Sequence, residues 1–272
     1  GVINPYSRHP AQIAMDFAAL DELSGGRAVL GLGSGIAAAV QRMGVDAGRP
    51  VAAVQEAIGI IRALLAGDEV TMHGRVFDVA GLRPAFRVPR QIPIYMAAAS
   101  ERALRVCGQI ADGLVVSNMT PSRSTARMTA IVAEAAGRAG RPMPRIVQYV
   151  PCVVGTDSEA ARREIKTAIG EALTMLWPAG DDWPRRRETA VAESGIPRRD
   201  VAAALERLRC RENAADALDD RFVTAFGIAG TADECLQQAA AYRAAGADEL
   251  ALTFAGSQPE LGIASLGRCL CP

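Results

Sequence analysis

The feature that most constrains this chain is a repeated succession of helix, glycine and short apolar strand. It occurs in DELSGGRAVLGLG at 21–33, in RVCGQIADGLVVSN at 105–118 and in AAYRAAGADELALTF at 240–254. Helices that alternate with buried apolar strands place those strands side by side in a parallel sheet covered by helices. The sequence therefore predicts an α/β protein.

Two further strands are predicted at 92–99 and 145–155, where IPIYMAAA and RIVQYVPCVVG stand, and a last β region at either 222–228 or 249–254. Together with the strands AVLGLG and GLVVSN of the first two stretches above, this gives about five strands. Five strands are too few for a closed eight-stranded barrel.

Side chains near the predicted helices indicate where they begin and which face is buried. Thr156 with Glu159, and Thr231 with Glu234, fit capping boxes at the starts of two helices. Apolar residues at helical spacing predict one buried face in the helix after residue 50; they are Val51, Val54, Ile58, Ile61 and Leu65.

The stretch from 177 to 221 breaks the alternation. It reads as a long connection with a helix near 200–209, and connections of this length are typical of functional insertions or lids. The basic run at 185–187 would meet an anionic substrate tail or form a solvated, salt-paired face. We expect a single domain over 1–272 with an insertion or lid around 177–221.

Composition excludes several classes of partner. Thirty basic and thirty acidic residues cancel, so the chain lacks the positive field that nucleic acid or an anionic membrane requires. No apolar run approaches the roughly 18 residues of a spanning helix, and no secretory signal opens the chain. A cytoplasmic protein that takes a small molecule, and neither nucleic acid nor membrane, is expected.

Metal and disulfide chemistry is not expected. The six cysteines contain no CxxC pair, and only His9 and His73 supply imidazoles, so we predict free thiols and no metal site. The C-x-C at 269–271 is a weak metal or oxidation signal. His73 lies in VTMHGRVF, which is typical of a surface hairpin.

The glycines of GLGSGI at 31–36 invite comparison with a dinucleotide-binding turn. That fingerprint needs a glycine where Ile36 stands, and a strand ending in an acidic residue where this sequence predicts a helix. The pattern argues against a Rossmann fold.

Three stretches together resemble the bacterial luciferase-like flavin and deazaflavin oxidoreductases, most of all the coenzyme F420-dependent group that includes methylenetetrahydromethanopterin reductase. They are NPYSRHPAQIAMDFAALDELSGGRAVLGLGSG at 4–35, RPAFRVPRQIPIYMAAASERALRVCGQIADGLVVSN at 83–118 and GTADECLQQAAAYRAAGADELAL at 230–252.

The resemblance implies a TIM (β/α)8 barrel of the luciferase-like type, with the cofactor at the carboxyl ends of the strands. The opening GVINPYSRHP is similar to the end of the family's third strand, so the chain would lack about three β/α units. The strands named above would then be the fourth to the eighth.

The resemblance also implies cofactor contacts near the start of the chain. Gly1 and Val2 match the position of a cis peptide behind the central ring; because such a bond needs surrounding support, we expect a trans or disordered bond here. Asn4 and Arg8 match the adjoining loop, where they would meet the cofactor or hold the loop.

Further cofactor contacts are implied at the ends of later strands. Gly33 and Ser34 match the strand end under the ring, where glycine would let the ring approach the backbone. The positions that receive the cofactor phosphate or lie along the next strand are Ala98, Ala99, Ser100, Gly113 and Leu114. Ser100 is equally compatible with an ordinary helix N-cap.

The function that the resemblance implies is transfer of a hydride between reduced coenzyme F420, an 8-hydroxy-5-deazaflavin, and a small organic substrate. Residues 36–39 offer no polar group, which leaves FMN open as the cofactor of a luciferase-like monooxygenase. A non-catalytic truncated relative is the third alternative. Arg8 and His9 lie near the site, but no catalytic residue is assigned. Exposed strand edges predict a homo-oligomer, most simply a dimer.

Overall fold

The computed structural model describes residues 1–180 and 182–270. The chain forms two compact units, the first made of Gly1–Val115 and Ile131–Arg145, and the second of Val116–Ala130 and 146–270. None of the described helices combines the length and apolar character that crossing a bilayer requires. The single-domain organisation stays a prediction.

The sheet of the first unit is parallel, as predicted. Its strands are β1 (Leu30–Leu32), β4 (Ile94–Ala97) and β5 (Gly113–Val116), with β4 paired to both of the others. Ile3 adds a parallel bridge to Leu32. This bridge lies beside β1, where the resemblance places the end of the third strand.

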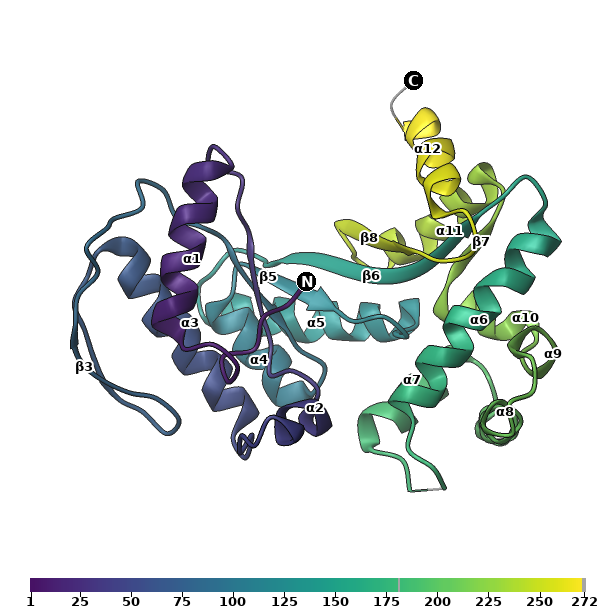
Figure 1. Cartoon of the computed structure of the whole chain (residues 1–272), viewed down its shortest axis with the longest axis horizontal. Helices are drawn as coiled ribbons and strands as arrows, with labels where there is room; N and C mark the ends of the chain where they lie inside the picture. The colour runs from purple at the N-terminus through teal and green to yellow at the C-terminus, as the bar shows by residue number, and fades with distance from the viewer. Residues whose placement is uncertain (181, 271–272) are drawn as a thin grey trace. The chain divides into compact units, whose positions relative to one another are not determined.

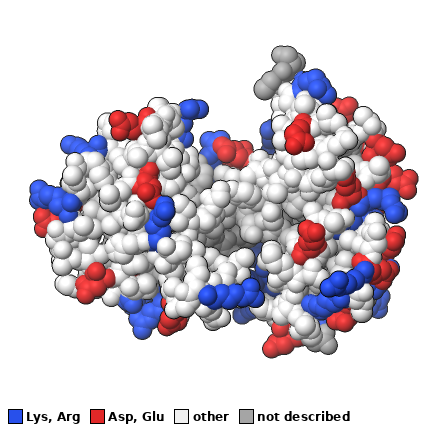
Figure 2. Space-filling view, in the orientation of Figure 1, with Lys and Arg blue, Asp and Glu red and all other residues white. Residues whose placement is uncertain are grey.

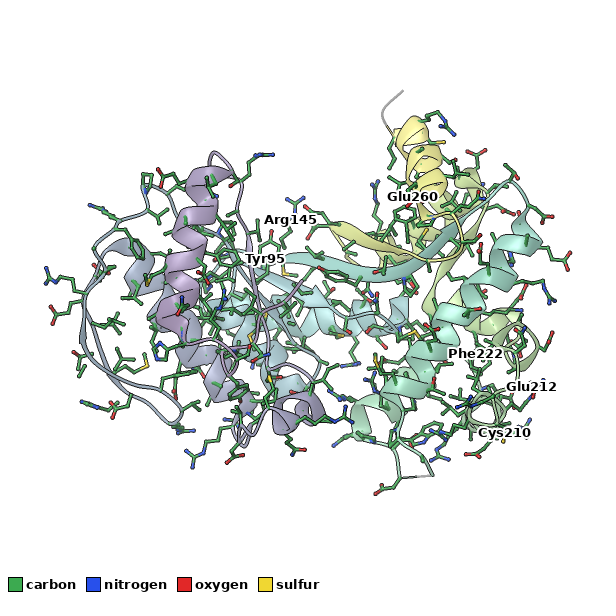
Figure 3. The ribbon with its side chains drawn as sticks, in the orientation of Figure 1. Tyr95, Arg145, Cys210, Glu212, Phe222 and Glu260 are labelled. Atoms are coloured by element: carbon green, nitrogen blue, oxygen red, sulfur yellow. The ribbon has the colours of Figure 1, made fainter. Side chains whose placement is uncertain are left out.

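The two faces of this sheet differ in side-chain size. The side chains of Leu32, Met96 and Leu114, which share one level of the sheet, are at most 1% exposed. In the preceding row of paired residues, whose side chains point to the opposite face, Tyr95 pairs with Gly31 on one side and Gly113 on the other. A β-carbon on Gly113 would lie 2.6 Å from Cδ1 of Tyr95, so this glycine makes room for the labelled ring in Figure 3.

Four helices accompany this sheet: α1 (Pro10–Leu23), α2 (Ala37–Arg42), α3 (Pro50–Ala66) and α4 (Glu101–Ile110). α3 packs against α1 and α4 (Figure 1). The predicted face of α3 is confirmed for Val54, Ile58, Ile61 and Leu65, which are buried, whereas Val51 in the first turn is half-buried. α1 ends before Gly25 and Gly26, whose φ angles of 64° and 80° suit a helix stop.

A hairpin of β2 (Val70–His73) and β3 (Asp78–Leu82) follows α3, and it confirms the surface hairpin predicted around His73. Glu56 of α3 holds its loop. The Glu56 carboxylate accepts hydrogen bonds from the amides of Arg75, Val76 and Phe77 at 2.8, 3.0 and 3.0 Å. The loop is therefore fixed beside the beginning of α3.

The second unit is built on β6 (Arg145–Val154), with β7 (Ile228–Gly230) and β8 (Glu249–Phe254) both parallel to it. The alternative that placed a last strand over 222–228 is wrong for most of that range, because Asp220–Phe226 forms helix α10. Asp219 caps this helix and its apolar residues are buried at helical spacing, which outweighs their strand propensity.

Most of the described residues between 177 and 221 are helical rather than a long loop. The helices of the second unit, including α5 that begins in it, are α5 (Ser122–Arg138), α6 (Ser158–Leu176), α7 (Arg185–Ser194), α8 (Arg198–Arg209), α9 (Ala214–Ala217), α10, α11 (Ala232–Ala244) and α12 (Pro259–Leu270). The rings of Trp177 and Phe226 pack edge to face, with their centres 6.3 Å apart. They belong to a core that includes Phe222, labelled in Figure 3. The helix predicted near 200–209 is confirmed. A lid role stays a prediction.

The basic run at 185–187 divides between solvent and this core. Arg185 and Arg186 are exposed, whereas the Arg187 guanidinium stacks 4.6 Å from the ring centre of Trp177. Burial, with a smaller contribution from Arg186, lowers the pKa of Arg187 to about 10. Arg187 therefore packs on an aromatic face instead of joining a solvated, salt-paired surface.

One of the two predicted capping boxes is present. Thr231 Oγ1 accepts from the amide of Glu234, and the Glu234 carboxylate accepts from the amide of Thr231. At the other position, Asp157 caps α6 in place of Thr156 by accepting from two amides. A carboxylate that accepts two amides also interacts with the helix dipole, which favours a start one residue later.

Gly108 lies where α4 packs closely against α5. A β-carbon on Gly108 would lie 2.5 Å from the carbonyl oxygen of Val132, which cannot move without distorting α5. Gly108→Ala is expected to lower the free energy of unfolding by about 1–3 kcal/mol in urea denaturation. Gly137→Ala is the control, since Gly137 of α5 has open space around it, and should raise stability by about 0.5 kcal/mol. A neutral Gly108→Ala would contradict this packing.

Glu56 makes stability depend on pH. Burial opposes its ionisation, but the three amide hydrogen bonds and the charge of Arg75 outweigh burial and hold the pKa of Glu56 below its ordinary value of 4.5. The stabilisation is therefore present above pH 4.5 and is lost as the pH falls through the lowered pKa. Glu56→Gln should unfold about 1 kcal/mol more easily at pH 7, with the gap closing toward pH 3.

Denaturation at several pH values measures this difference. Glu69→Gln is the control, because Glu69 forms an exposed pair with Arg83 on the same hairpin and should change stability little. A gap between wild type and Glu56→Gln that stays constant with pH would contradict the role of the carboxylate.

Candidate functional site

The carboxyl ends of β1 and β4 lie side by side in the first unit. Gly33 and Ser34 follow β1, and a β-carbon on Gly33 would lie 3.0 Å from Cβ of Ala97, the last residue of β4. Ala98, Ala99 and Ser100 come next in the chain. The structure therefore brings the predicted positions after these two strands to one edge of the sheet.

Val2 gives a different reason for the glycine at position 33. A side chain on Gly33 would point at Val2, whose Cγ1 would be 2.8 Å from the new carbon. Gly33 therefore makes room for Val2 and Ala97. On the side where a β-carbon would stand, these two residues fill the space, so the glycine does not leave room for a ring there. The described residues contain no cis peptide bond, so the Gly1–Val2 bond is trans as expected.

Asn4 holds its own loop. Its Oδ1 accepts from the amides of Tyr6 and Ser7 at 3.1 and 2.8 Å, which forms a local turn. Its Nδ2 lies beside Gly35, whose φ of 71° requires glycine. The loop-holding alternative is confirmed for Oδ1, and a cofactor contact through Nδ2 stays a prediction.

Arg8 and His9 are also used locally. Arg8 forms an ion pair with Asp16 of α1. His9 caps α1, because its Nδ1 accepts from the amide of Ala11 at 3.2 Å. Neither side chain is placed as a proton donor for a reaction, and the catalytic residue remains unassigned.

Ser100 is the N-cap of α4, and its Oγ accepts from the amide of Ala103 at 3.3 Å. Within the part of the chain that the structure describes, the amides of Glu101 and Arg102 have no hydrogen-bond acceptor. Ala99 beside them is exposed and small. The N-terminus of α4 therefore combines capping by Ser100 with amides that can bind an anion.

Gly113 and Leu114 do not reach this edge. They open β5 opposite Tyr95 and Met96, whereas β4 ends at Ala97 opposite Val115. Leu114 is fully buried and Gly113 is covered by the Tyr95 ring. The sequence could not place them, because strand register depends on pairing between segments far apart in the chain.

Tyr6 is a polar group that the sequence reasoning missed. Its Oη is buried and has no hydrogen-bond partner among the described residues. Burial, followed by the nearby Asp46 carboxylate, raises the pKa of Tyr6 above its ordinary value of 10.0, so the phenol stays protonated. The available signal was a single aromatic residue in the polar loop NPYSRH.

Metal binding finds no support in the described residues, where no cluster of three or more histidine, cysteine, aspartate or glutamate side chains occurs. Five cysteines are free thiols there, which agrees with the sequence prediction: Cys107, Cys152, Cys210, Cys235 and Cys269. Cys271 of the predicted C-x-C lies outside the described residues.

The family described as luciferase-like monooxygenase matches residues 1–249. The chain belongs to the luciferase-like monooxygenase family. Among its curated relatives, the 5,10-methylenetetrahydromethanopterin reductase of Methanolobus tindarius is 30% identical over 235 residues, which cover 86% of this chain and 70% of the relative. The F420-dependent glucose-6-phosphate dehydrogenase of Beutenbergia cavernae is 31% identical over 64% of this chain and 53% of that protein.

Solved structures support the luciferase-like barrel fold. The coenzyme F420-dependent tetrahydromethanopterin reductase of Methanopyrus kandleri superposes with a TM-score of 0.85 at 24% identity, covering 98% of this luciferase-like chain and 80% of that structure. An F420-dependent secondary alcohol dehydrogenase superposes with a TM-score of 0.75 at 18% identity, over 98% and 76% of the two chains. At these identities the likeness shows the fold.

Tyr6→Phe tests whether the buried phenol serves the fold or a ligand. Removing an unpaired buried hydroxyl should leave the free energy of unfolding unchanged or up to about 1 kcal/mol higher. Thr125→Val is the contrast, because Thr125 Oγ1 lies 2.7 Å from Oε1 of buried Gln148, and it should lose about 1–2 kcal/mol. Chemical denaturation measures both variants. A Tyr6→Phe loss above 1 kcal/mol would mean that the hydroxyl is bonded within the fold.

Proposed function

We propose that this luciferase-like chain is an oxidoreductase that transfers a hydride between coenzyme F420 and a small organic substrate. The observation that carries the proposal is the identity of about a third to relatives whose names specify F420. The substrate itself stays unassigned.

The residues at this edge fit a flat cofactor with a phosphate group. The side chains after the two strands are small: Ser34 is half-buried, Ala98 is buried and Ala99 is exposed. Small side chains let a planar ring approach the backbone. The unbonded amides at the start of α4 match a phosphate in charge and in donor chemistry.

Bound F420 would supply or accept the hydride. The chain would position it: the amides of Glu101 and Arg102 would donate to the phosphate, and Ser34 Oγ would donate to a polar edge of the ring. Gly1, Val2 and Gly33 would lie behind the ring through their backbone, with Val2 packed on Gly33.

The remaining expectations are coarser. A homodimer receives support from exposed apolar side chains on one face of α12, namely Ile263 and Leu270, which a second copy would cover. The cytoplasmic location and the absence of nucleic-acid partners stay predictions. FMN binding in place of F420, or no binding, is an outcome that a direct titration distinguishes.

Ala99→Asp tests the phosphate position. A carboxylate beside the first turn of α4 would occupy the free amides and repel a phosphate, so the affinity for F420 should fall about tenfold or more. Ala160→Asp places the same exposed substitution in the first turn of α6 and is the matched control. Absorbance titration with F420 measures both; equal affinities for the two variants would contradict the proposed phosphate position.

A further inference from the structure

A basic cavity lies beside this edge, within the first unit. It has a volume of about 280 Å³, and its polar lining includes Arg49 before α3, Arg75 from the hairpin loop and Arg102 in the first turn of α4. An adjoining cavity of about 440 Å³ shares Arg75 and Arg102. Three separate segments therefore each contribute an arginine to the lining of this cavity.

These arginines form no close ion pair, although the charge of Arg75 acts on the Glu56 carboxylate. Arg49, Arg75 and Arg102 take part in no salt bridge within the described part of the chain. Glu56 lines the adjoining cavity, but its oxygens already accept three hairpin amides. By contrast, neighbouring Arg83 and Arg105 are paired with Glu69 and with Glu101. Glu56 offsets part of the charge of Arg75, whereas Arg49 and Arg102 have no ion-pair partner among the described residues, so the cavity keeps a positive field that an anion would satisfy.

The backbone adds to this field. The first turn of the 17-residue helix α3 has no side-chain cap and no acidic residue, and its Val51 and Ala52 line the cavity. The first turn of α4 contributes Arg102 and its unbonded amide. Both helices begin on the side of the sheet where β1 and β4 end, so both N-termini direct partial positive charge to this region.

Over the face shown in Figure 2, acidic and basic side chains are interspersed. The net formal charge of the chain is zero. Attraction of an anion therefore depends on a local group of charges rather than on the field of the whole molecule. Arginine forks also suit phosphate and carboxylate groups, because each can donate two parallel hydrogen bonds.

We propose that the cavity between Arg49, Arg75 and Arg102 binds an anionic group with at least two negative charges, such as a phosphate or a set of carboxylates. The group belongs either to the phosphate-bearing tail of the cofactor or to a separate phosphate compound. The first source rests on the proposed function. It fits the chain connectivity, because Arg102 follows Ser100 by two residues.

Inorganic pyrophosphate is the probe for the site itself. Its dissociation constant for the 272-residue chain, from isothermal titration calorimetry at low salt, should rise about fivefold to tenfold in each of Arg49→Gln, Arg75→Gln and Arg102→Gln. Arg83→Gln is the control, since Arg83 lies on the same hairpin outside the cavity. Unchanged thermal unfolding midpoints would show that the variants are folded. Absence of pyrophosphate binding, or an equal effect of Arg83→Gln, would overturn the proposal.

A second titration identifies the source of the anion. If the cofactor tail occupies the cavity, the three variants weaken F420 binding but leave unchanged the binding of the deazaflavin core without its tail. If only pyrophosphate binding weakens, the site takes a separate phosphate compound. Failure of the wild-type chain to bind F420 would refute the proposed function, and the pyrophosphate titration would still decide the cavity. If the variants weaken the binding of F420 and of the tailless core equally, the tail does not occupy the cavity.

Discussion

The pairing of Tyr95 between Gly31 and Gly113 is the constraint on which the first unit depends. Its ring needs the space that Gly113 leaves, and this fixes β4 in register with β1 and β5. A one-residue slip would turn buried Leu32, Met96 and Leu114 to the opposite face. This register brings the ends of β1 and β4 level, so that Ser34 and the residues after Ala97 share one edge.

The two ends of this sheet differ in how their charges are satisfied. At the start of β5, the Asp112 carboxylate accepts from Arg62 at 2.7 Å, Arg141 at 3.2 Å and the amide of Ile94 at 2.9 Å. At the carboxyl end, the first amides of α4 and the side chains of Arg49 and Arg102 have no such partners among the described residues. In barrels of this kind, ligands bind at the carboxyl end and the amino end serves stability, and the distribution of paired charges here agrees with that division.

Most local signals in the sequence predicted local structure, the capping box at Thr156 being the exception, whereas long-range packing was not predictable. The buried face of α3, the hairpin around His73 and the cap at Thr231 each depend on neighbouring residues. Helix α10 and the register of Gly113 depend on contacts with distant segments. The Gly33 position was predicted through the resemblance, but its contact with Val2 was not, because residues 2 and 33 meet only after the strands align.

The central claim is that F420 binds at the carboxyl edge of β1 and β4. Hydrogen–deuterium exchange of the chain, with and without F420, tests it most directly. The account predicts slower exchange at amides 33–35 and 99–103 when F420 is present, and unchanged exchange at amides 158–162, which begin α6 in the second unit. Slower exchange at 158–162 alone, or no change at 99–103 under saturating F420, would contradict it.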